Sequence, residues 1–311
     1  MPEGHTLHRL ARSVHDAFGG RLVEAGSPQG RFADGAALLD GHRVARSDAH
    51  GKHLLVGFLP PDAPGRRTPE RWLHVHLGLY GKVAFGTGEP PPPVGAVRLR
   101  LVTLDGSADA GADADGQDDG VRWADLRGPT ACEVLLRPEV DALRARLGPD
   151  PLRRDDGPER FLARAGASRV TIGALLMHQD VLAGAGNIYR AEALYRAGLD
   201  PAVPGRDVDP ERLLGVWDDL AVLMRAGVRS GRIVTTRPAD RRRGLVTASG
   251  DDAEGSPVRR GQSGAHYVYR RQGLPCRLCG TTVATSVVEG RNLFWCPSCQ
   301  APGVTTSPFA A

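Results

Sequence analysis

Long apolar runs are absent from this sequence of 311 residues. No stretch approaches the ~20 consecutive apolar residues that a membrane-spanning helix requires, so we expect no membrane partner. Residues 1–18 carry charges and lack the apolar centre of a signal peptide, which predicts a cytoplasmic protein. Disulfides are rare in that reducing compartment.

Lysine is also nearly absent. Only Lys52 and Lys82 occur among the 40 basic residues, and all the others are arginine. Arginine keeps its proton near neutral pH, whereas lysine can lose it. A lysine in this chain is therefore a better candidate for chemistry than a lysine usually is.

Cysteine is scarce, but its spacing is informative. Four of the five cysteines form the pattern C-x2-C-x16-C-x2-C, at Cys276, Cys279, Cys296 and Cys299. Four thiolates satisfy tetrahedral zinc and leave no position open for water, so the pattern predicts one structural zinc ion. Two disulfides or four unrelated thiols are the alternatives. The fifth cysteine, Cys132, lies in an apolar run and is expected in the core.

The net charge is only +4, yet the charges are unevenly distributed. Residues 105–119 hold six aspartates, and residues 225–271 hold eleven arginines against four acidic residues. A basic segment beside a zinc unit predicts a polyanionic partner, with nucleic acid first among the candidates. The alternative is an ordinary solvated surface.

Apolar spacing predicts a mainly β region opened by one helix and followed by a helical region. The helix is expected at 4–18, with strands at 53–59, 72–77 and 97–101 and a tight turn at 78–81. Residues 137–150 are expected to form a connection and 237–264 a flexible loop. Later helices are expected at 158–166, 170–182, 188–197 and 211–229.

The sequence begins Met1-Pro2-Glu3, and a methionine before proline is normally removed. Pro2 would then carry a secondary α-amine, a group whose ordinary pKa of about 8 leaves part of it neutral and nucleophilic. Attack of this amine on a sugar C1′ gives an iminium ion, and Glu3 can move protons during ring opening. The alternative is a Met-Pro start that occurs by chance.

Two further segments are typical of phosphate binding. The letters GAGN at 184–187 precede a predicted helix, whose first N–H groups attract anions. Arg291 lies between the two cysteine pairs, five residues before Cys296. The alternatives are a packed helix–turn–helix core and an ordinary surface arginine.

Together these segments resemble the formamidopyrimidine-DNA glycosylase/endonuclease VIII family of base-excision repair enzymes. The resemblance is carried by MPEG at the start, GKHLL from Gly51, HLGLYG from His76, LGPDPL from Leu147, GAGNIYRAEAL from Gly184 and the cysteine pairs around WCPSCQ. The start MPEGHTLHRLA and the LYG turn look closest to the actinobacterial endonuclease VIII-like branch.

The resemblance implies a multidomain α+β fold. An N-terminal β-sandwich domain with one N-terminal helix would span 1–136, a helix–two-turn–helix DNA-binding domain 137–265 and a zinc-ribbon hairpin 266–302. The protein would act on damaged DNA, duplex or single-stranded, as a monomer without a small-molecule cofactor.

The resemblance also implies roles for individual residues. Pro2 would be the Schiff-base nucleophile, Glu3 the acid that assists base release, and Lys52 a DNA contact that transfers protons in β-elimination. Arg291 would grip the lesion phosphate and serve δ-elimination. The remaining DNA-binding candidates are Asn187 on the backbone, Arg127, and the pair Leu79 and Tyr80, which would fill the gap left by an everted nucleotide. Glu192 falls in the same segment as Asn187 and would lie near the site.

Departures from the family pattern bear on the substrate. Leu79 replaces the methionine usual in the branch that reads oxidised purines, and the segment around Arg127 lacks the aromatic residue of that branch. We therefore expect oxidised pyrimidines to be preferred. Gly78 replaces a common glutamine, and Gly173 replaces a phosphate-binding lysine.

Two other hypotheses compete with this one. The chain could be a non-catalytic paralogue that recognises damaged DNA with the same fold. Alternatively, His74 and His76, two apart on one strand face, could be ligands of a catalytic metal.

Overall fold

A computed structural model describes residues 2–64, 67–104, 120–241, 264–301 and 303. The acidic segment 105–119 and most of the predicted loop 237–264 lie outside the described residues. Packing divides the chain into two compact units, Met1–Arg146 and Leu147–Ala311.

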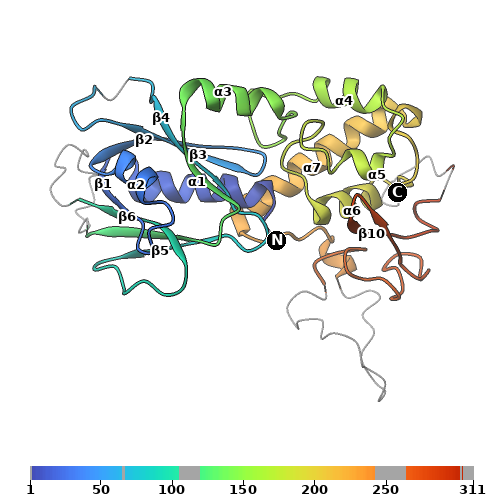
Figure 1. The fold of residues 1–311 in the computed structure, drawn as a ribbon. Helices are drawn as coiled ribbons and strands as arrows, with labels where there is room; N and C mark the ends of the chain where they lie inside the picture. The colour runs from blue at the N-terminus through green and yellow to red at the C-terminus, as the bar shows by residue number, and fades with distance from the viewer. Residues whose placement is uncertain (1, 65–66, 105–119, 242–263, 302, 304–311) are drawn as a thin grey trace, which may run out of the picture. The chain divides into compact units, whose positions relative to one another are not determined.

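The first unit is built on one eight-stranded sheet with the order β5-β7-β6-β1-β2-β3-β4-β8 (Figure 1). Every neighbouring pair is antiparallel. The predicted sandwich is therefore made from a single continuous hydrogen-bonded sheet. The strands are β1 (Leu22–Gly26), β2 (His42–His50), β3 (His53–Leu59), β4 (Arg71–His76), β5 (Lys82–Thr87), β6 (Val97–Thr103), β7 (Arg122–Arg127) and β8 (Ala131–Leu136).

Helix α1 (Gly4–Phe18) confirms the helix predicted at 4–18. Its apolar stripe is buried against the inner face of the sheet, where it contacts β2, β3 and β7. The stripe follows the helical repeat, so burial of one face stabilises the whole element. The short helix α2 (Ala33–Leu39) contributes Ala36 and Leu39 to the same core.

The segment 137–150, predicted as a connection, instead begins with helix α3 (Arg137–Arg146). Val140 and Leu143 of α3 pack on Leu55 and Trp72, which lie on the other face of the sheet. A stripe of only two apolar side chains is too short for periodicity to identify, and tertiary packing on Trp72 supplies the missing stabilisation.

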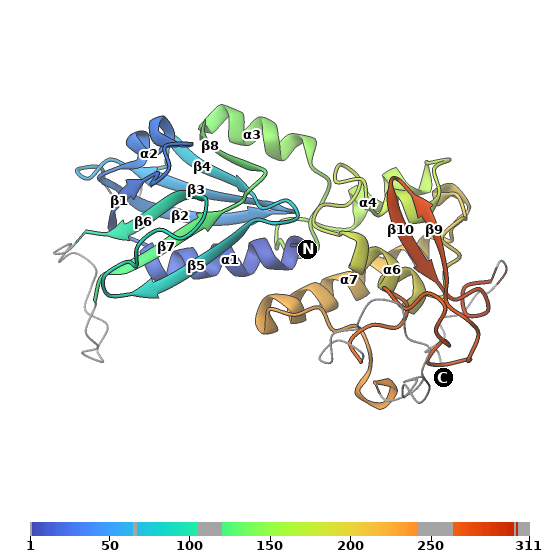
Figure 2. The same cartoon turned by 60° about the horizontal axis from the view of Figure 1, so that its bottom comes forward.

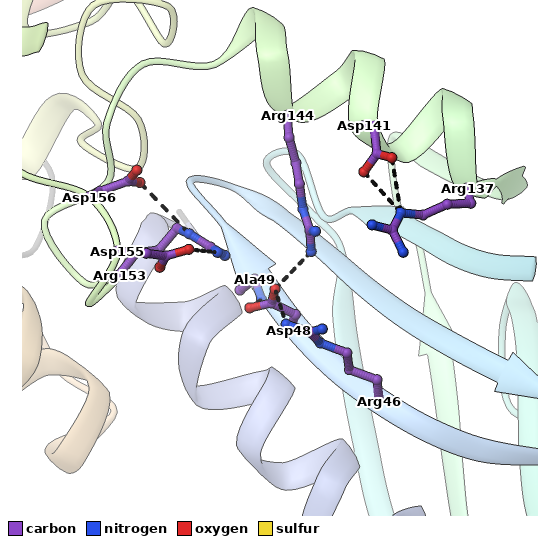
Figure 3. A network of polar contacts seen from close by, with 9 residues as sticks. All are labelled: Arg46, Asp48, Ala49, Arg137, Asp141, Arg144, Arg153, Asp155 and Asp156. Carbon is purple, nitrogen blue, oxygen red and sulfur yellow. Dashed lines mark hydrogen bonds and ion pairs between the residues drawn. The ribbon is translucent and has the colours of Figure 1, made fainter. Parts of the chain in front are cut away.

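A polar contact ties α3 to the end of β2. Arg144 donates a hydrogen bond to Asp48 over 2.7 Å, and Asp48 also accepts from the backbone N–H of Ala49 (Figure 3). The carboxylate of Asp48 thus fixes the last residues of β2. Those residues lead directly into the turn that carries Lys52.

The second unit joins a helical cluster to a two-stranded hairpin, in the yellow-green to red part of the chain (Figure 2). Its elements are α4 (Glu159–Gly166), α5 (Ile172–Leu175), α6 (Asn187–Arg196), η1 (Gly205–Asp207), α7 (Pro210–Ser230), η2 (Pro238–Asp240), β9 (Ala284–Val288) and β10 (Arg291–Trp295). The helices predicted at 158–166, 188–197 and 211–229 are confirmed as α4, α6 and α7.

The helix predicted at 170–182 is wrong beyond its first turn, because α5 ends at Leu175. Gln179 stabilises the non-helical segment that follows. Its side chain donates to the carbonyls of Met177 and Ala185 and accepts from the N–H of Gly184. These bonds give the backbone an alternative to the helical ladder and shape the turn that leads into α6.

Of the helices in the described part of the chain, none is long and apolar enough to cross a membrane.

Candidate functional site

Pro2 and Glu3 lie at the start of α1. Pro2 is partly exposed, whereas Glu3 is fully buried in extended conformation at the helix N-cap. The carbonyl of Glu3 accepts the first backbone hydrogen bond of the helix, from Thr6 over 2.8 Å. The positive end of the helix dipole favours a carboxylate there. If Met1 is removed, Pro2 offers a partly exposed amine beside a buried carboxyl group, a pair that suits covalent attack coupled to proton transfer.

Lys52 sits in the two-residue turn between β2 and β3, where His50 pairs with His53. Gly51, the first residue of that turn, has a φ of 59°. Burial lowers the pKa of His76 below its ordinary value, and the positive charge of Lys52 lowers it further. Lys52 therefore belongs to the end of the sheet where β2, β3 and β4 bring several histidines together.

Leu79 and Tyr80 form the tip of the turn between β4 and β5. Their exposed fractions are 54% and 85%, which is unusual for large apolar side chains and suits insertion into a partner. The turn is held by a hydrogen bond from Gly81 N–H to the Leu77 carbonyl over 2.9 Å. Gly78 opens the turn with a φ of 64°, and an added Cβ there would lie 1.8 Å from Oγ1 of Thr130.

Gly78→Ala is therefore expected to destabilise the protein more than Gly30→Ala does. Both glycines have positive φ, but an added Cβ at Gly30 meets nothing within 4 Å. Left-handed strain alone costs about 1–2 kcal/mol, so we expect that loss for Gly30→Ala and about 1–3 kcal/mol more for Gly78→Ala. Denaturant unfolding measures both, and equal losses would show that Thr130 does not restrict the turn.

Arg127 ends β7 and is engaged in an ion pair. Its guanidinium group lies 3.0 Å from the fully buried carboxylate of Asp125, which Arg100 also contacts at 2.7 Å. Burial alone would raise the pKa of Asp125, but the two guanidinium groups hold it below its ordinary value. A role of Arg127 on DNA would therefore have to use the part of its guanidinium group that Asp125 does not hold.

Asn187 and Arg291 lie close together in the second unit. Asn187 is the first residue of α6, and its side-chain amide donates to the carbonyl of Asn292 over 2.9 Å. Arg291 is exposed and starts β10 after a two-residue turn of Glu289 and Gly290, both with positive φ. Such a turn closes a tight hairpin, so Arg291 sits at its tip. The bond to Asn292 joins that tip to the helix start.

Arg190 is a residue of this site that sequence reasoning missed. It is fully buried and bonds to the Asn187 side chain, to the carbonyls of Gly173 and Asn292 and, more weakly, to that of Val288. One guanidinium group thus connects α5, the start of α6 and both strands of the hairpin. Its position one turn after Asn187 was the available signal, because residues three apart on a helix are neighbours.

Glu192, on the same helix, is also fully buried. Its carboxylate accepts from the backbone N–H groups of Tyr267, Val268 and Tyr269, each over 2.8 Å, and from the hydroxyl of Thr235. A buried charge is tolerated only when its hydrogen bonds are satisfied, as they are here. Glu192 therefore anchors the segment that leads into the cysteine hairpin, a role that its sequence position did not reveal.

The four cysteines converge at the base of that hairpin. Their sulfur atoms all lie within 4.8 Å of one another, and they are the one group of three or more potential metal ligands in the described part of the chain. Zinc–sulfur bonds of about 2.3 Å in a tetrahedron place sulfur atoms about 3.8 Å apart, so the cluster fits that ion. Cys132 packs against the sheet core, and burial raises the pKa of its thiol to about 12.

Tyr195 of α6 supports the cluster from outside. Its buried hydroxyl lies 3.1 Å from Sγ of Cys276, and its ring stacks on Tyr267 at a centroid distance of 5.0 Å. Groups that hydrogen-bond to metal ligands orient them, and their loss commonly costs 10- to 100-fold in metal affinity.

Tyr195→Phe is therefore expected to weaken zinc binding about tenfold or more while the ring stacking is kept. Competition with a chromogenic chelator measures the change. Tyr80→Phe, on the exposed turn of the first unit, is the control and is expected to leave zinc affinity unchanged. Equal affinities for all three proteins would remove Tyr195 from the metal site.

Gly173 packs too closely for a side chain. An added Cβ would lie 2.8 Å from the carbonyl oxygen of Pro201 and 3.0 Å from its Cβ. A lysine at this position would require the backbone near Pro201 to shift. The absence of a lysine is therefore matched by the local packing.

Comparison with known proteins agrees with this arrangement. The sequence pattern of the formamidopyrimidine-DNA glycosylase N-terminal domain matches residues 1–130, and that of the formamidopyrimidine-DNA glycosylase H2TH domain matches 147–238. The pattern of a zinc finger found in FPG and IleRS matches residues 273–302. Together these three patterns cover most of the chain in the order expected.

Two relatives are similar along most of their length. Endonuclease 8 1 of Mycobacterium tuberculosis is 43% identical over 304 residues, which cover 96% of this chain and 100% of the relative. Formamidopyrimidine-DNA glycosylase of Ralstonia nicotianae is 32% identical over 277 residues, which cover 85% of each chain. Identity at this level and coverage shows membership of a common family.

Solved structures share the fold. The complex between Lactococcus lactis Fpg and DNA containing an abasic site matches with a TM-score of 0.69 at 18% identity, covering 96% of this chain and 100% of that one. MutM (FPG) from Thermus thermophilus matches with a TM-score of 0.64 at 27% identity, covering 97% and 100%. The protein therefore belongs to the formamidopyrimidine-DNA glycosylase/endonuclease VIII family of DNA glycosylases.

Proposed function

We propose that this protein is a bifunctional DNA glycosylase and abasic-site lyase that removes oxidised pyrimidines from DNA. The observation that carries the proposal is the pairing of a partly exposed Pro2 with a fully buried Glu3 at the helix start, in a chain of this family. Because its substrate would be chromosomal DNA, we expect it at the nucleoid, acting as a monomer.

The proposed reaction begins at Pro2 after removal of Met1. The amine nitrogen forms a bond to C1′ as the bond between C1′ and the base breaks. The departing base keeps that electron pair and takes up the proton that the amine nitrogen loses, and the sugar ring opens as the bond between C1′ and O4′ breaks. Glu3 supplies the proton that ring opening requires. The product is an iminium ion, which withdraws electrons from C2′.

Strand cleavage follows from that electron withdrawal. Loss of a proton from C2′ lets the electron pair expel the 3′-phosphate, which is β-elimination. Lys52, partly buried in its turn, is the proposed proton carrier for this step. Expulsion of the 5′-phosphate by δ-elimination is assigned to the site where Arg291 binds the lesion phosphate.

DNA binding is proposed to involve both units. The exposed pair Leu79 and Tyr80 would occupy the space of the everted nucleotide, while Asn187, Arg291 and Arg127 contact the backbone. Zinc, held by the four cysteines, would keep the hairpin folded so that Arg291 stays at its tip. Phosphate contacts of this kind make affinity fall as salt rises.

The proposal is tested with short duplexes that carry a single oxidised pyrimidine, a single oxidised purine or no lesion. We expect base release and strand cleavage at the oxidised pyrimidine, about tenfold or more faster than at the oxidised purine, a ratio that corresponds to about 1.4 kcal/mol of barrier difference. Binding to every lesion without release of any base would instead identify a non-catalytic recognition protein. Faster release of the oxidised purine would overturn the substrate assignment.

A further inference from the structure

A hydrogen-bonded chain of three side chains crosses β3, β4 and β8 at the Lys52 end of the sheet. Nδ1 of His53 lies 2.8 Å from Nε2 of His74, and Nδ1 of His74 lies 2.8 Å from a carboxylate oxygen of Glu133. The strand register sets this up, because His74 pairs directly with Glu133 and lies diagonally across from His53. The proposed reaction does not yet use these residues.

The donor and acceptor chemistry of the three groups, at these distances, assigns the protons along the chain. The Glu133 carboxylate accepts, so His74 carries its proton on Nδ1. When His74 is neutral its Nε2 must accept, and the donor to it is the Nδ1–H of His53. His53 then presents a lone pair at its other nitrogen, Nε2. Each imidazole is thus held in one tautomer by the next group.

The two ends of the chain have different surroundings. The Glu133 side chain is 54% exposed to solvent, whereas that of His74 is only 6% exposed. His53 follows Lys52 directly in the sequence, and its ring centroid lies 5.1 Å from that of His76, the histidine whose pKa Lys52 lowers. The hydrogen-bonded series therefore runs from solvent at Glu133, through the buried imidazole of His74, to His53 at the end of the sheet that carries Lys52.

Burial keeps His53 neutral. It lowers the pKa of His53 to about 3, and electrostatic interactions with His74, His76, His50 and Arg146 act in the same direction. These groups come from β4, β2 and α3, with Lys52 on the adjoining turn. A neutral histidine between two hydrogen-bonding groups can pass a proton by exchanging tautomers, without forming a lasting cation.

We propose that Glu133, His74 and His53 form a proton relay that exchanges one proton between solvent and the Lys52 turn during strand cleavage. This inference rests on the proposed lyase function. Either hydrogen bond alone would be an ordinary contact between neighbouring strands. Their continuous order, from an exposed carboxylate to the neighbour of the lysine, is what a relay requires.

The transfer balances as follows. A proton that Lys52 has taken up leaves its Nζ and bonds to Nε2 of His53, and the Nδ1–H of His53 passes to Nε2 of His74. The Nδ1–H of His74 then passes to the carboxylate of Glu133, which releases it to water. Each N–H bond breaks as the next bond forms, so the imidazoles stay neutral. The reverse sequence brings a proton in.

The test compares wild type with Glu133→Gln, His74→Gln and the double variant in single-turnover cleavage of DNA that already contains an abasic site. Glutamine at 133 still accepts the hydrogen bond from His74 but cannot take up a proton. We expect each single variant to cleave the strand about 10- to 100-fold more slowly, and the double variant to be no slower than the singles, because the relay fails as a unit.

The pH dependence separates a relay from a structural contact. When an imidazole of the relay gains a second proton its acceptor nitrogen is lost, so the advantage of wild type over Glu133→Gln should shrink as the pH falls. Protonation of the Pro2 amine slows both proteins alike, so the relay is read from the ratio of the two rates at each pH. Glu70→Gln, an exposed glutamate paired with Arg67 away from the relay, is the matched control and should keep the wild-type rate and profile.

Borohydride trapping of the iminium ion distinguishes this inference from the proposed function. The variants are expected to give the wild-type yield of trapped adduct, because the relay acts after the adduct forms. Wild-type cleavage rate and pH profile in Glu133→Gln, with the adduct intact, would overturn the relay and leave the lyase in place. Failure of wild type to form any adduct would overturn the proposed function and the relay with it.

Discussion

Glu3→Gln is expected to lower the rate of base release about 100- to 1,000-fold while cleavage at a ready-made abasic site stays within a few-fold of wild type. The glutamine fills the same buried space but cannot donate the proton that ring opening needs. An abasic site has already lost its base, so its reaction with Pro2 depends less on that proton. Single-turnover assays on the two substrates measure both rates.

Glu24→Gln is the control for this variant. Glu24 is an exposed glutamate of β1, so its replacement should leave both rates unchanged. Equal losses on the two substrates would show that Glu3 supports the fold or the Pro2 amine rather than base release. Unchanged base release would remove Glu3 from the reaction.

Removing the metal site is expected to have the second large effect. Cys276→Ser/Cys279→Ser should lose zinc and weaken binding to abasic-site DNA about 100-fold or more, because the hairpin that carries Arg291 depends on the cluster. The first unit should stay folded, since its core contains none of these residues. Fluorescence anisotropy gives the affinity, and limited proteolysis read by mass spectrometry reports whether residues 1–146 stay folded.

Cys132→Ala provides the matched control, because Cys132 is half-buried on the sheet of the first unit. It should retain one zinc ion per chain and wild-type affinity, with at most a modest loss of stability. DNA binding that survives in the double variant at wild-type strength would show that the hairpin does not hold the DNA.

The elements that sequence predicted well are those in which one face carries a long apolar stripe. Helix α1 follows this rule because its repeat continues over four turns and buries Phe18 at its end. The apolar repeat did not predict helix α3, because its two buried residues pack on Trp72, a partner distant in sequence. For α5 the predicted helix was too long, because the apolar pattern continues beyond Leu175 into the segment where the Gln179 side chain bonds to the backbone.

Within the site, sequence indicated groups whose chemistry is visible in their type and spacing. The cysteine pairs are such a case, and their sulfur atoms do converge. Arg190 and Glu192 are different, because nothing in a charged residue shows that it will be buried. Their importance arises from segments about 80 to 100 residues away that supply their hydrogen bonds. Tyr195 likewise has a role only because the fold places Cys276 beside its hydroxyl.

The most direct test of the central claim is to locate the covalent bond to DNA. Borohydride adds hydride to C1′ of the iminium ion and leaves a stable amine linking protein and DNA, which can be digested and read by mass spectrometry. We expect the sugar remnant on the nitrogen of Pro2 in a protein that has lost Met1. A remnant on Lys52, or none from protein that cleaves the strand, would contradict the account.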